Sequence, residues 1–313
     1  MSDVPGFQHI PVLYEETLAA LEIRPGGVYA DGTIGGGGHS AGILERLDDQ
    51  GRLFGIDRDQ EALAAARKRL GDDHRVRLLR GNFHDAKAML PEGLQLDGAL
   101  LDLGVSSWQL DSPERGFSYH QNAPLDMRMD QSGGITAAEW LNISDEMTIK
   151  EALYQYADER WAARIAQIIL EMRREKPFET TGDLVRAVDK AIPKAVRQKD
   201  EGHPARRAFQ AVRIAVNDEI APLTQALEDW VSLLKPGGRL AVISFHSIED
   251  RVVKQAFKRL EVGCICPPKL PVCVCGKKPQ VRLPRGYPAA ASAAEAGDNP
   301  RARSAKLRIA EKL

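Results

Sequence analysis

The sequence predicts an α/β protein with a doubly wound, mostly parallel sheet and an inserted all-helical domain. Buried strands alternate with helices between residues 28 and 103, which is the pattern of a parallel sheet. From residue 111 to about residue 202 no buried strand is evident, and the strand–helix pattern then resumes. A chain of 313 residues can form one large domain or two ordinary ones.

The first part of the chain supplies most of the predicted sheet. Four strands are expected, over residues 28–31, 51–57, 76–81 and 96–103. Helices are expected over residues 14–21, 40–47 and 60–70, where apolar residues recur at helical spacing. Right-handed crossovers would make these strands parallel.

The middle of the chain is expected to form the helical insertion, over residues 111–205, within a discontinuous domain made of residues 1–110 and 206–313. A polar loop over residues 111–134 should precede four helices, over residues 136–141, 148–156, 160–174 and 182–192. The insertion would hold a substrate over the carboxyl edge of the sheet, where open α/β folds bind ligands.

The last part of the chain is expected to complete the sheet. Its predicted elements are a long helix bent at Pro222, a strand, a second helix, a flexible run of small residues and a closing edge strand, over residues 206–234, 239–246, 248–260, 289–296 and 304–310.

A glycine-rich turn after the first strand predicts the ligand site. Asp31 ends the strand and glycines occupy residues 35–38, so the backbone can turn sharply and approach a ligand closely. The second strand ends in Asp57, about 20 residues on, where nucleotide-binding folds place a carboxylate for ribose hydroxyls. The glycine spacing is not a regular G-x-G-x-x-G, and Asp31 precedes it. Both features favour an S-adenosylmethionine pocket over a dinucleotide pocket.

Composition and charge indicate a soluble globular protein with one basic region. Hydrophobic residues make up 43% of the chain and charged residues 28%. From Arg251 to the end there are 14 Lys and Arg against 4 Asp and Glu, a balance of +10, which leaves −11 on the rest. A polyanionic partner and a solvated basic tail both fit this asymmetry.

No membrane span is expected, because no stretch approaches the roughly 20 apolar residues that a span requires. Residues 1–6 lack the basic and apolar regions of a signal peptide, so a cytoplasmic location is expected.

Taken together, the motifs resemble those of the small-subunit ribosomal RNA cytosine-N4 methyltransferases of the H family. The resemblance spans nearly the whole chain in order. The matching strings are Asp31-Gly32-Thr33, Gly37-Gly38-His39-Ser40, Gly55-Ile56-Asp57-Arg58-Asp59, Leu101-Asp102-Leu103-Gly104-Val105-Ser106-Ser107, Arg115-Gly116-Phe117-Ser118, Pro124-Leu125-Asp126-Met127-Arg128-Met129, Phe209-Gln210-Ala211-Val212-Arg213-Ile214, Ser244-Phe245-His246-Ser247-Ile248-Glu249-Asp250-Arg251 and Asn299-Pro300-Arg301-Ala302-Arg303-Ser304.

The resemblance implies a Rossmann-like domain that transfers a methyl group from S-adenosylmethionine to N4 of a decoding-centre cytidine in 16S rRNA. It implies the small ribosomal subunit as partner and allows a homodimer, and it leaves open whether naked RNA or the assembled subunit is the substrate. It also implies which residues bind the cofactor. Gly37, Gly38 and His39 would bind its methionine end, and Asp57 would bind its ribose. Phe83 would lie beside the adenine, and Asp102 and Gln109 near the reacting end. Apart from the resemblance, Phe83 is expected to be a core aromatic. His39 could equally be an ordinary helix-start residue.

Asp102 is the expected catalytic residue. The exocyclic amine of cytosine is a poor nucleophile, and a carboxylate that accepts an N–H bond restores some electron density to it. Many amino-methyltransferases carry Pro-Pro-aromatic after this acid, whereas this chain has Leu103-Gly104-Val105, so that clamp cannot be carried over. Asp102 could instead bind only the amino group of the cofactor.

Substrate contacts are expected from charged and aromatic residues around the insertion and at the end of the fifth strand. Arg pairs with phosphate, and Phe can stack on a splayed base. The residues are Asp126, Arg128, Arg206, Arg207, Phe209 and His246. The alternative for the arginines is an ordinary surface charge.

The four cysteines form two C-x-C pairs, Cys264 with Cys266 and Cys273 with Cys275. They could clamp a structural zinc ion, although C-x-C is tighter than the usual zinc spacing, or remain as reduced thiols. No catalytic metal is expected, because some members of the resembled family lack these cysteines.

Two other classes of function remain open. An NAD-linked oxidoreductase would use the same turn and Asp57, but it predicts a regular glycine fingerprint that the chain lacks. A non-catalytic ribosome-assembly protein would use the basic tail without needing both Asp57 and Asp102.

Overall fold

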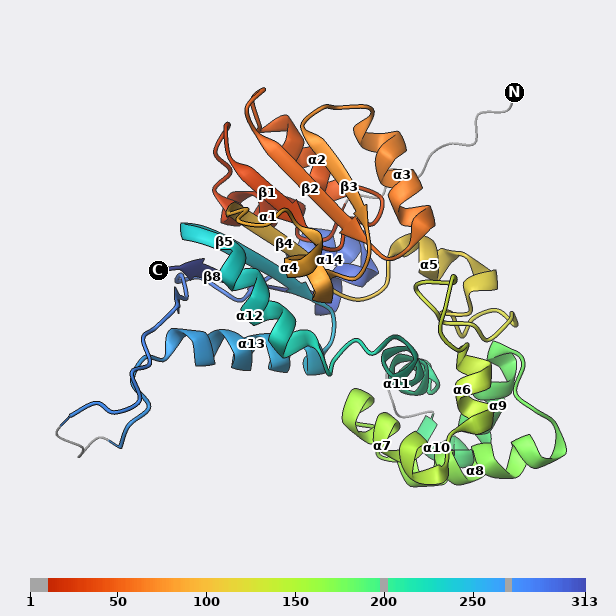
Figure 1. The fold of residues 1–313 in the computed structure, drawn as a ribbon. Helices are drawn as coiled ribbons and strands as arrows, with labels where there is room; N and C mark the ends of the chain where they lie inside the picture. The colour runs from red at the N-terminus through yellow and green to blue at the C-terminus, as the bar shows by residue number, and fades with distance from the viewer. Residues whose placement is uncertain (1–10, 198–201, 268–271) are drawn as a thin grey trace, which may run out of the picture. The chain divides into compact units, whose positions relative to one another are not determined.

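The computed structural model describes residues 11–197, 202–267 and 272–313 (Figure 1). The stretch 1–6, for which no signal peptide is expected, lies outside them. The chain divides into two compact units, Met1–Gly104 with Pro222–Leu313, and Val105–Ala221. Among the described residues, no helix combines the length and the apolar character needed to cross a membrane.

The first unit is built on a mixed sheet in the order β3-β2-β1-β4-β5-β8-β6, with β7 paired to β8. The neighbouring pairs from β3 to β5 are parallel. β8 lies antiparallel between β5 and the short β6. The strands are β1 Val28–Asp31, β2 Arg52–Asp57, β3 Val76–Arg80, β4 Leu96–Asp102, β5 Leu234–Ser244, β6 Val281–Arg282, β7 Ala289–Ala290 and β8 Lys306–Lys312.

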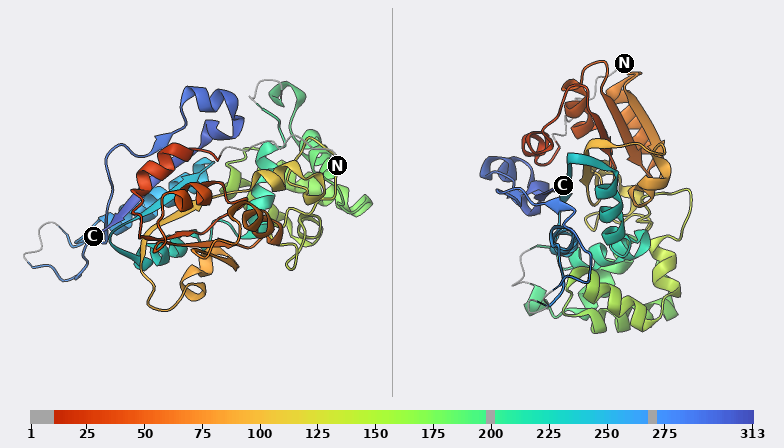
Figure 2. Two further views of the ribbon diagram at one scale, coloured as in Figure 1. Left: turned by 90° about the horizontal axis from the view of Figure 1, so that it is seen from above. Right: turned by 60° about the vertical axis from the view of Figure 1, so that its left-hand side comes forward.

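Two groups of helices cover the sheet (Figures 1 and 2). Helices α1 Tyr14–Leu21, α2 Gly38–Glu45 and α3 Gln60–Leu70 contact one another in sequence and close one core, while α12 Leu223–Leu233 packs against α4 Ala86–Met89 and α13 Ser247–Glu261. Chain order reverses between β1 and β4, so the sheet is doubly wound, as predicted.

The second unit is helical. Its main helices are α5 Ser107–Asp111, α6 Ala137–Ile143, α7 Glu146–Ala157, α8 Ala162–Glu175, α9 Thr181–Ala191, α10 Lys194–Arg197 and α11 Arg206–Asn217. α11 packs against α6 and α7, α7 packs against α8, and α8 packs against α9. Within the described residues its only strand pairing is the isolated bridge between Pro124 and Thr180.

Three predictions at the level of elements need correction. The expected long helix over residues 206–234 is two helices: Asp218 adopts a left-handed conformation after α11, and Pro222 precedes α12. α11 belongs to the helical unit, whose bounds are 105–221 rather than 111–205. The run 289–296, expected to be flexible, contains β7 and the start of α14 Ala293–Asp298, which Ser292 caps by accepting from Glu295 N.

Candidate active site

Three acids come together at the carboxyl edge of the sheet because each ends one of three adjacent parallel strands. Asp31 ends β1, Asp57 ends β2 and Asp102 ends β4. β1 lies between β2 and β4, and the order of the chain reverses at this point. Open α/β sheets bind ligands at such a reversal.

The glycine-rich turn is held closed by its own hydrogen bonds. Asp31 accepts from Thr33 N through Oδ1 (3.1 Å) and from Ser40 Oγ through Oδ2 (2.8 Å). Gly35 and Gly37 have positive φ values of 50° and 75°, which a side chain would strain. Both oxygens of Asp31 therefore serve the turn itself, rather than only a ligand's amino group.

Asp57 ties the second strand to the same turn. Its Oδ2 accepts from Gly35 N at 2.9 Å, and its Oδ1 accepts from Asp59 N at 2.9 Å. Each carboxylate oxygen can accept a further bond, so the ribose role proposed for Asp57 remains chemically available.

Asp102 presents an unsatisfied acceptor at this edge. Its side chain is 27% exposed overall, but its Oδ1 is buried and has no hydrogen-bond partner within the described part of the chain. The backbone of Asp102 is fixed, because its N–H donates to Thr33 Oγ1 at 2.6 Å. A buried carboxylate oxygen without a partner is costly in a folded protein, so it marks a place for an external donor or cation.

Burial disfavours the ionisation of all three acids. Burial raises the pKa of Asp31 from 3.8 to about 6. Burial, with added repulsion from Asp31 and Glu249, raises the pKa of Asp102 well above its usual value. Burial likewise raises the pKa of Asp57. Acidic groups held together with raised pKa values are typical of sites that receive a positive charge.

His39 lies beside Asp102 but is not its counter-ion at neutral pH. The His39 Nδ1 to Asp102 Oδ2 distance is 3.7 Å, and His39 Nε2 lies 3.1 Å from Val12 O. Burial lowers the pKa of His39 to about 4, so the ring is neutral at pH 7. It leaves the negative charge of this edge uncompensated.

Glu249, which was not among the residues predicted for the site, is a buried member of this edge. It is 2% exposed, and it accepts from Phe245 N at 2.9 Å. His246 caps α13, with Glu249 Oε1 3.0 Å from its Nε2. His246 is thus held by its own helix, and its predicted role toward substrate stays a proposal. An acid immediately after a strand–turn segment was the available signal for Glu249.

Phe83 lies in the short helical turn after β3, beside the glycine-rich turn. It is half-buried rather than a full core residue, and its carbonyl oxygen accepts from Trp230 Nε1 at 3.0 Å. A Cβ added at Gly32 would lie 3.2 Å from the Phe83 Cβ. A partly exposed flat ring in this position is suited to pack against a planar ligand.

The donor set fits S-adenosylmethionine. The ammonium and sulfonium groups of this cofactor carry positive charge, which would complement the acids at this edge. A Cβ added at Gly36 would meet no atom within 4 Å, so the turn is open to a ligand at this position. Gly37, Gly38 and His39 follow directly and begin α2. The sequence-based assignment of Gly37, Gly38, His39, Asp57, Phe83 and Asp102 to the cofactor stays a proposal.

Gln109 belongs to the helical unit, in α5. Ser106 and Gln109 form a capping box, with Gln109 Oε1 accepting from Ser106 N at 3.1 Å. Its side chain is buried and serves the start of its helix.

Asp126 and Arg128 bind each other within the predicted polar loop. Arg128 donates to both carboxylate oxygens of Asp126, at 2.7 and 2.9 Å. Buried Arg115 and Asn217 hold the carbonyl oxygens of Met129 and Met127 (3.0 and 2.7 Å). The loop is therefore an anchored structure, and Arg128 offers less free charge than the sequence suggested.

The prediction that Phe209 stacks on a base is wrong for this structure. Phe209 is 3% exposed and lies in the core of the helical unit. Its ring packs edge-on against Tyr119, with ring centres 5.6 Å apart. The sequence missed Tyr119 and His203, which are half-buried and stack with centres 4.7 Å apart.

Arg206 and Arg207 are exposed in the first turn of α11, and neither forms an ion pair with any residue that the structure describes. Cations at a helix N-terminus oppose the helix dipole, so these charges do not stabilise α11. They are available to an anion.

Comparison with known proteins identifies the family. The model described as the MraW methylase family matches residues 6–313. Two proteins named "Ribosomal RNA small subunit methyltransferase H" are 55% and 53% identical, from Symbiobacterium thermophilum over 312 residues and from Heliobacterium modesticaldum over 311. They cover 98% of this chain and 97% and 99% of their own lengths. A protein of the same name from Geobacter sp. (strain M21) is 51% identical, covering 98% of this chain and 99% of its own length.

A family match over almost the whole chain excludes both the oxidoreductase and the non-catalytic interpretation, and it agrees with the acid-rich edge and its glycine turn. The chain belongs to the MraW methylase family of S-adenosylmethionine-dependent methyltransferases.

Proposed function

We propose that the protein methylates the exocyclic N4 amine of a decoding-centre cytidine in 16S rRNA. The relatives' name supplies the small-subunit ribosomal RNA. The Oδ1 of Asp102 lies at the carboxyl edge of the sheet and has no hydrogen-bond partner among the described residues, and this observation best supports an amine as the acceptor.

Asp102 suits the protonation change of this reaction. A carbon–nitrogen bond forms, a carbon–sulfur bond breaks, and the amine releases one proton. S-adenosylmethionine supplies the electrophilic methyl group. An ionised Asp102 would accept an N–H bond from the amine and then take up the released proton, a step favoured by a pKa raised well above the ordinary value.

The alternative is that Asp102 only binds the ammonium group of the cofactor. The two roles are separated by Asp102→Asn, which keeps the shape and removes the charge. The expected result is a fall of at least a hundredfold in single-turnover methylation, with S-adenosylmethionine affinity within tenfold of wild type. A loss confined to cofactor affinity, with normal turnover at saturating cofactor, would assign Asp102 to binding alone.

The helical unit is proposed to carry the RNA-binding surface. Arg206 and Arg207 are exposed without ion-pair partners among the described residues. His203, close to them in sequence, stacks on Tyr119 with an interplanar angle of 20°. Arginines combined with aromatic rings that are not fully buried can bind single-stranded RNA, through phosphates and through base stacking.

The double variant Arg206→Gln/Arg207→Gln tests this surface. RNA affinity should fall, and the slope of log affinity against log salt should become shallower by about 1–2, since each phosphate contact to a single strand contributes about 0.7. The matched control is Arg160→Gln/Arg174→Gln, which removes two exposed charges from the same unit. Equal effects of both double variants would reduce the proposal to general electrostatic attraction.

A further inference from the structure

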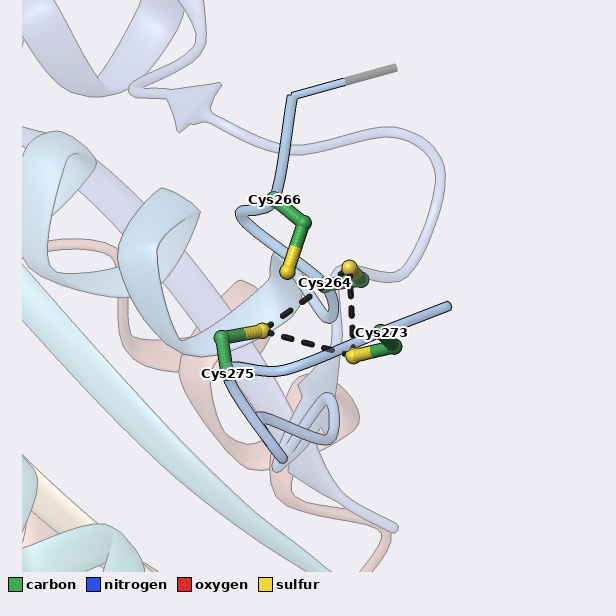
Figure 3. Close-up of side chains that lie close together, drawn as sticks. All are labelled: Cys264, Cys266, Cys273 and Cys275. Carbon is green, nitrogen blue, oxygen red and sulfur yellow. Dashed lines mark hydrogen bonds between the residues drawn. The ribbon is translucent and has the colours of Figure 1, made fainter. Parts of the chain in front are cut away.

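The segment between α13 and β6 brings all four cysteines of the chain together (Figure 3). Their Sγ atoms all lie within 4.8 Å of one another. Cys264 is 3.5 Å from Cys273 and 3.8 Å from Cys275, and Cys273 is 3.6 Å from Cys275. Two C-x-C pairs thus converge from opposite sides of one loop.

These distances fit a single tetrahedral ion. Zinc–sulfur bonds of about 2.3 Å in a tetrahedron place neighbouring sulfurs about 3.8 Å apart. An iron–sulfur cluster sets inorganic sulfide and several irons between its cysteines, so it needs a wider arrangement. The site therefore fits one metal ion with four thiolate ligands.

Backbone N–H groups around the cysteines donate hydrogen bonds to the sulfur atoms, as thiolates require. Ile265 N donates to Cys275 Sγ at 3.4 Å, and Val274 N donates to Cys266 Sγ at 3.4 Å. The middle residue of each C-x-C pair thus donates to the second cysteine of the other pair. This reciprocal arrangement orients two sulfurs and stabilises their negative charge, as outer-shell bonds do at metal sites.

Within its described residues, 262–267 and 272–280, the loop has no buried side chain that could form a hydrophobic core. Three of the described apolar side chains are strongly exposed: Ile265 by 65%, Val272 by 70% and Val274 by 78%. Its base is fixed, since Gln280 N donates to Leu260 O at 2.8 Å. A short excursion whose described residues gather four thiols but bury no apolar side chain requires a metal or a covalent link to keep one conformation.

We propose that Cys264, Cys266, Cys273 and Cys275 bind one structural Zn²⁺ ion. The ion takes the place of a core for the loop. It lies in a segment distinct from the strand ends that carry Asp31, Asp57 and Asp102, so it takes no part in methyl transfer.

The test begins with the metal content of the full chain, purified without chelators. Elemental analysis should find about one zinc per chain. Cys264→Ser should lose at least nine-tenths of it, whereas Val274→Ser, which changes a non-ligand between two ligands, should keep it. Replacement of zinc by Co²⁺ should give thiolate charge-transfer absorption and the visible bands of a tetrahedral site, absent in Cys264→Ser.

Two further measurements decide the role of the ion. Chelation should raise proteolytic cleavage within residues 262–280 by at least tenfold, while S-adenosylmethionine affinity stays unchanged. Intact mass measurement of chain purified under reducing conditions should show four free thiols after metal removal. Zinc below one-tenth of an equivalent after incubation with excess Zn²⁺, zinc retained in Cys264→Ser, or a disulfide in the reduced chain would each overturn the proposal.

Discussion

At the scale of single residues, the candidate site is defined by negative charge that the protein itself does not neutralise. Asp31 is 2% exposed and satisfied by the turn, while Asp102 retains a buried oxygen without a partner among the described residues. The nearby His39 is neutral at pH 7, because burial lowers its pKa to about 4. A cationic ligand would remove this imbalance, which is why cofactor binding and ionisation should be coupled.

Asp57→Ala should weaken S-adenosylmethionine binding by about 1–3 kcal/mol, because ribose hydroxyls would lose a buried acceptor. Calorimetry on the folded variant is the measurement. Asp72→Ala, at an exposed carboxylate after α3, is the matched control and should bind normally. Unchanged affinity in Asp57→Ala would remove this residue from the pocket.

The pH dependence of folding should contain opposing contributions from the buried acids, whose pKa values are raised, and from His39, whose pKa is lowered. The raised pKa of Asp31, about 6 against 3.8, means that its contribution to the free energy of unfolding falls as pH rises from about 4 to about 6. The lowered pKa of His39, about 4 against 6.5, means that its contribution is lost as pH falls from about 6.5 to about 4. The contributions of Asp31 and His39 each amount to about 3 kcal/mol and oppose each other. The raised pKa values of Asp57 and Asp102 act in the same direction as that of Asp31.

Asp31→Asn removes one of these contributions, while those of His39, Asp57 and Asp102 remain. Its free energy of unfolding should rise more steeply than that of wild type between about pH 4 and pH 6. Urea unfolding at several pH values measures both slopes. Parallel curves for the two proteins would show that Asp31 does not titrate in this range.

At the scale of elements, the glycine-rich turn divides into positions that pack and a position that faces open space. A Cβ at Gly32 would lie 2.5 Å from Leu101 Cδ2 and 2.7 Å from Trp230 Cζ2. At Gly36 the same atom would meet nothing within 4 Å. The first glycine is required by the fold, and the second leaves room for a ligand.

Gly36→Ala should therefore leave the melting temperature unchanged but weaken S-adenosylmethionine binding about tenfold, or about 1.4 kcal/mol. Thermal unfolding and calorimetry measure the two effects. Gly133→Ala, where an added Cβ also meets nothing within 4 Å, is the control in the helical unit. Normal cofactor affinity in Gly36→Ala would place the ligand elsewhere along the edge.

The positions at which the strands end were predictable from the sequence, but the residues that each side chain contacts in the fold were not. β1, β2 and β4 end at acids that follow apolar runs, so periodicity alone located Asp31, Asp57 and Asp102. The burial of Phe209 was not predictable, because a helical sequence pattern shows which residues share a face of the helix but not what covers that face. The clustering of the four cysteines was not predictable either, because the spacing of the cysteines in the sequence could not show that the two C-x-C pairs come together.

At the scale of the whole molecule, the two units have separate cores and separate kinds of candidate residue. Acids gather at the strand ends of the sheet unit, whereas Arg206 and Arg207, which form no ion pair with any described residue, lie on the helical unit. One cluster of buried apolar residues belongs to the strands and helices α1 to α3, and another to α6 through α11. Each unit is therefore expected to fold on its own core.

The last prediction is that the sheet unit binds cofactor without the helical unit but cannot methylate. Residues 105–221 would be replaced by a Gly/Ser linker joining Gly104 to Pro222, the bounds of the compact unit. S-adenosylmethionine binding should be retained because Asp57, Phe83 and Asp102 all remain, with a modest loss if Gln109 contacts the cofactor. Methylation of purified small subunits should fall to background, because Arg206 and Arg207 are removed. Methylation at the same nucleotide would show that the helical unit does not position substrate. Loss of cofactor binding in a folded variant would instead show that the pocket extends into α5.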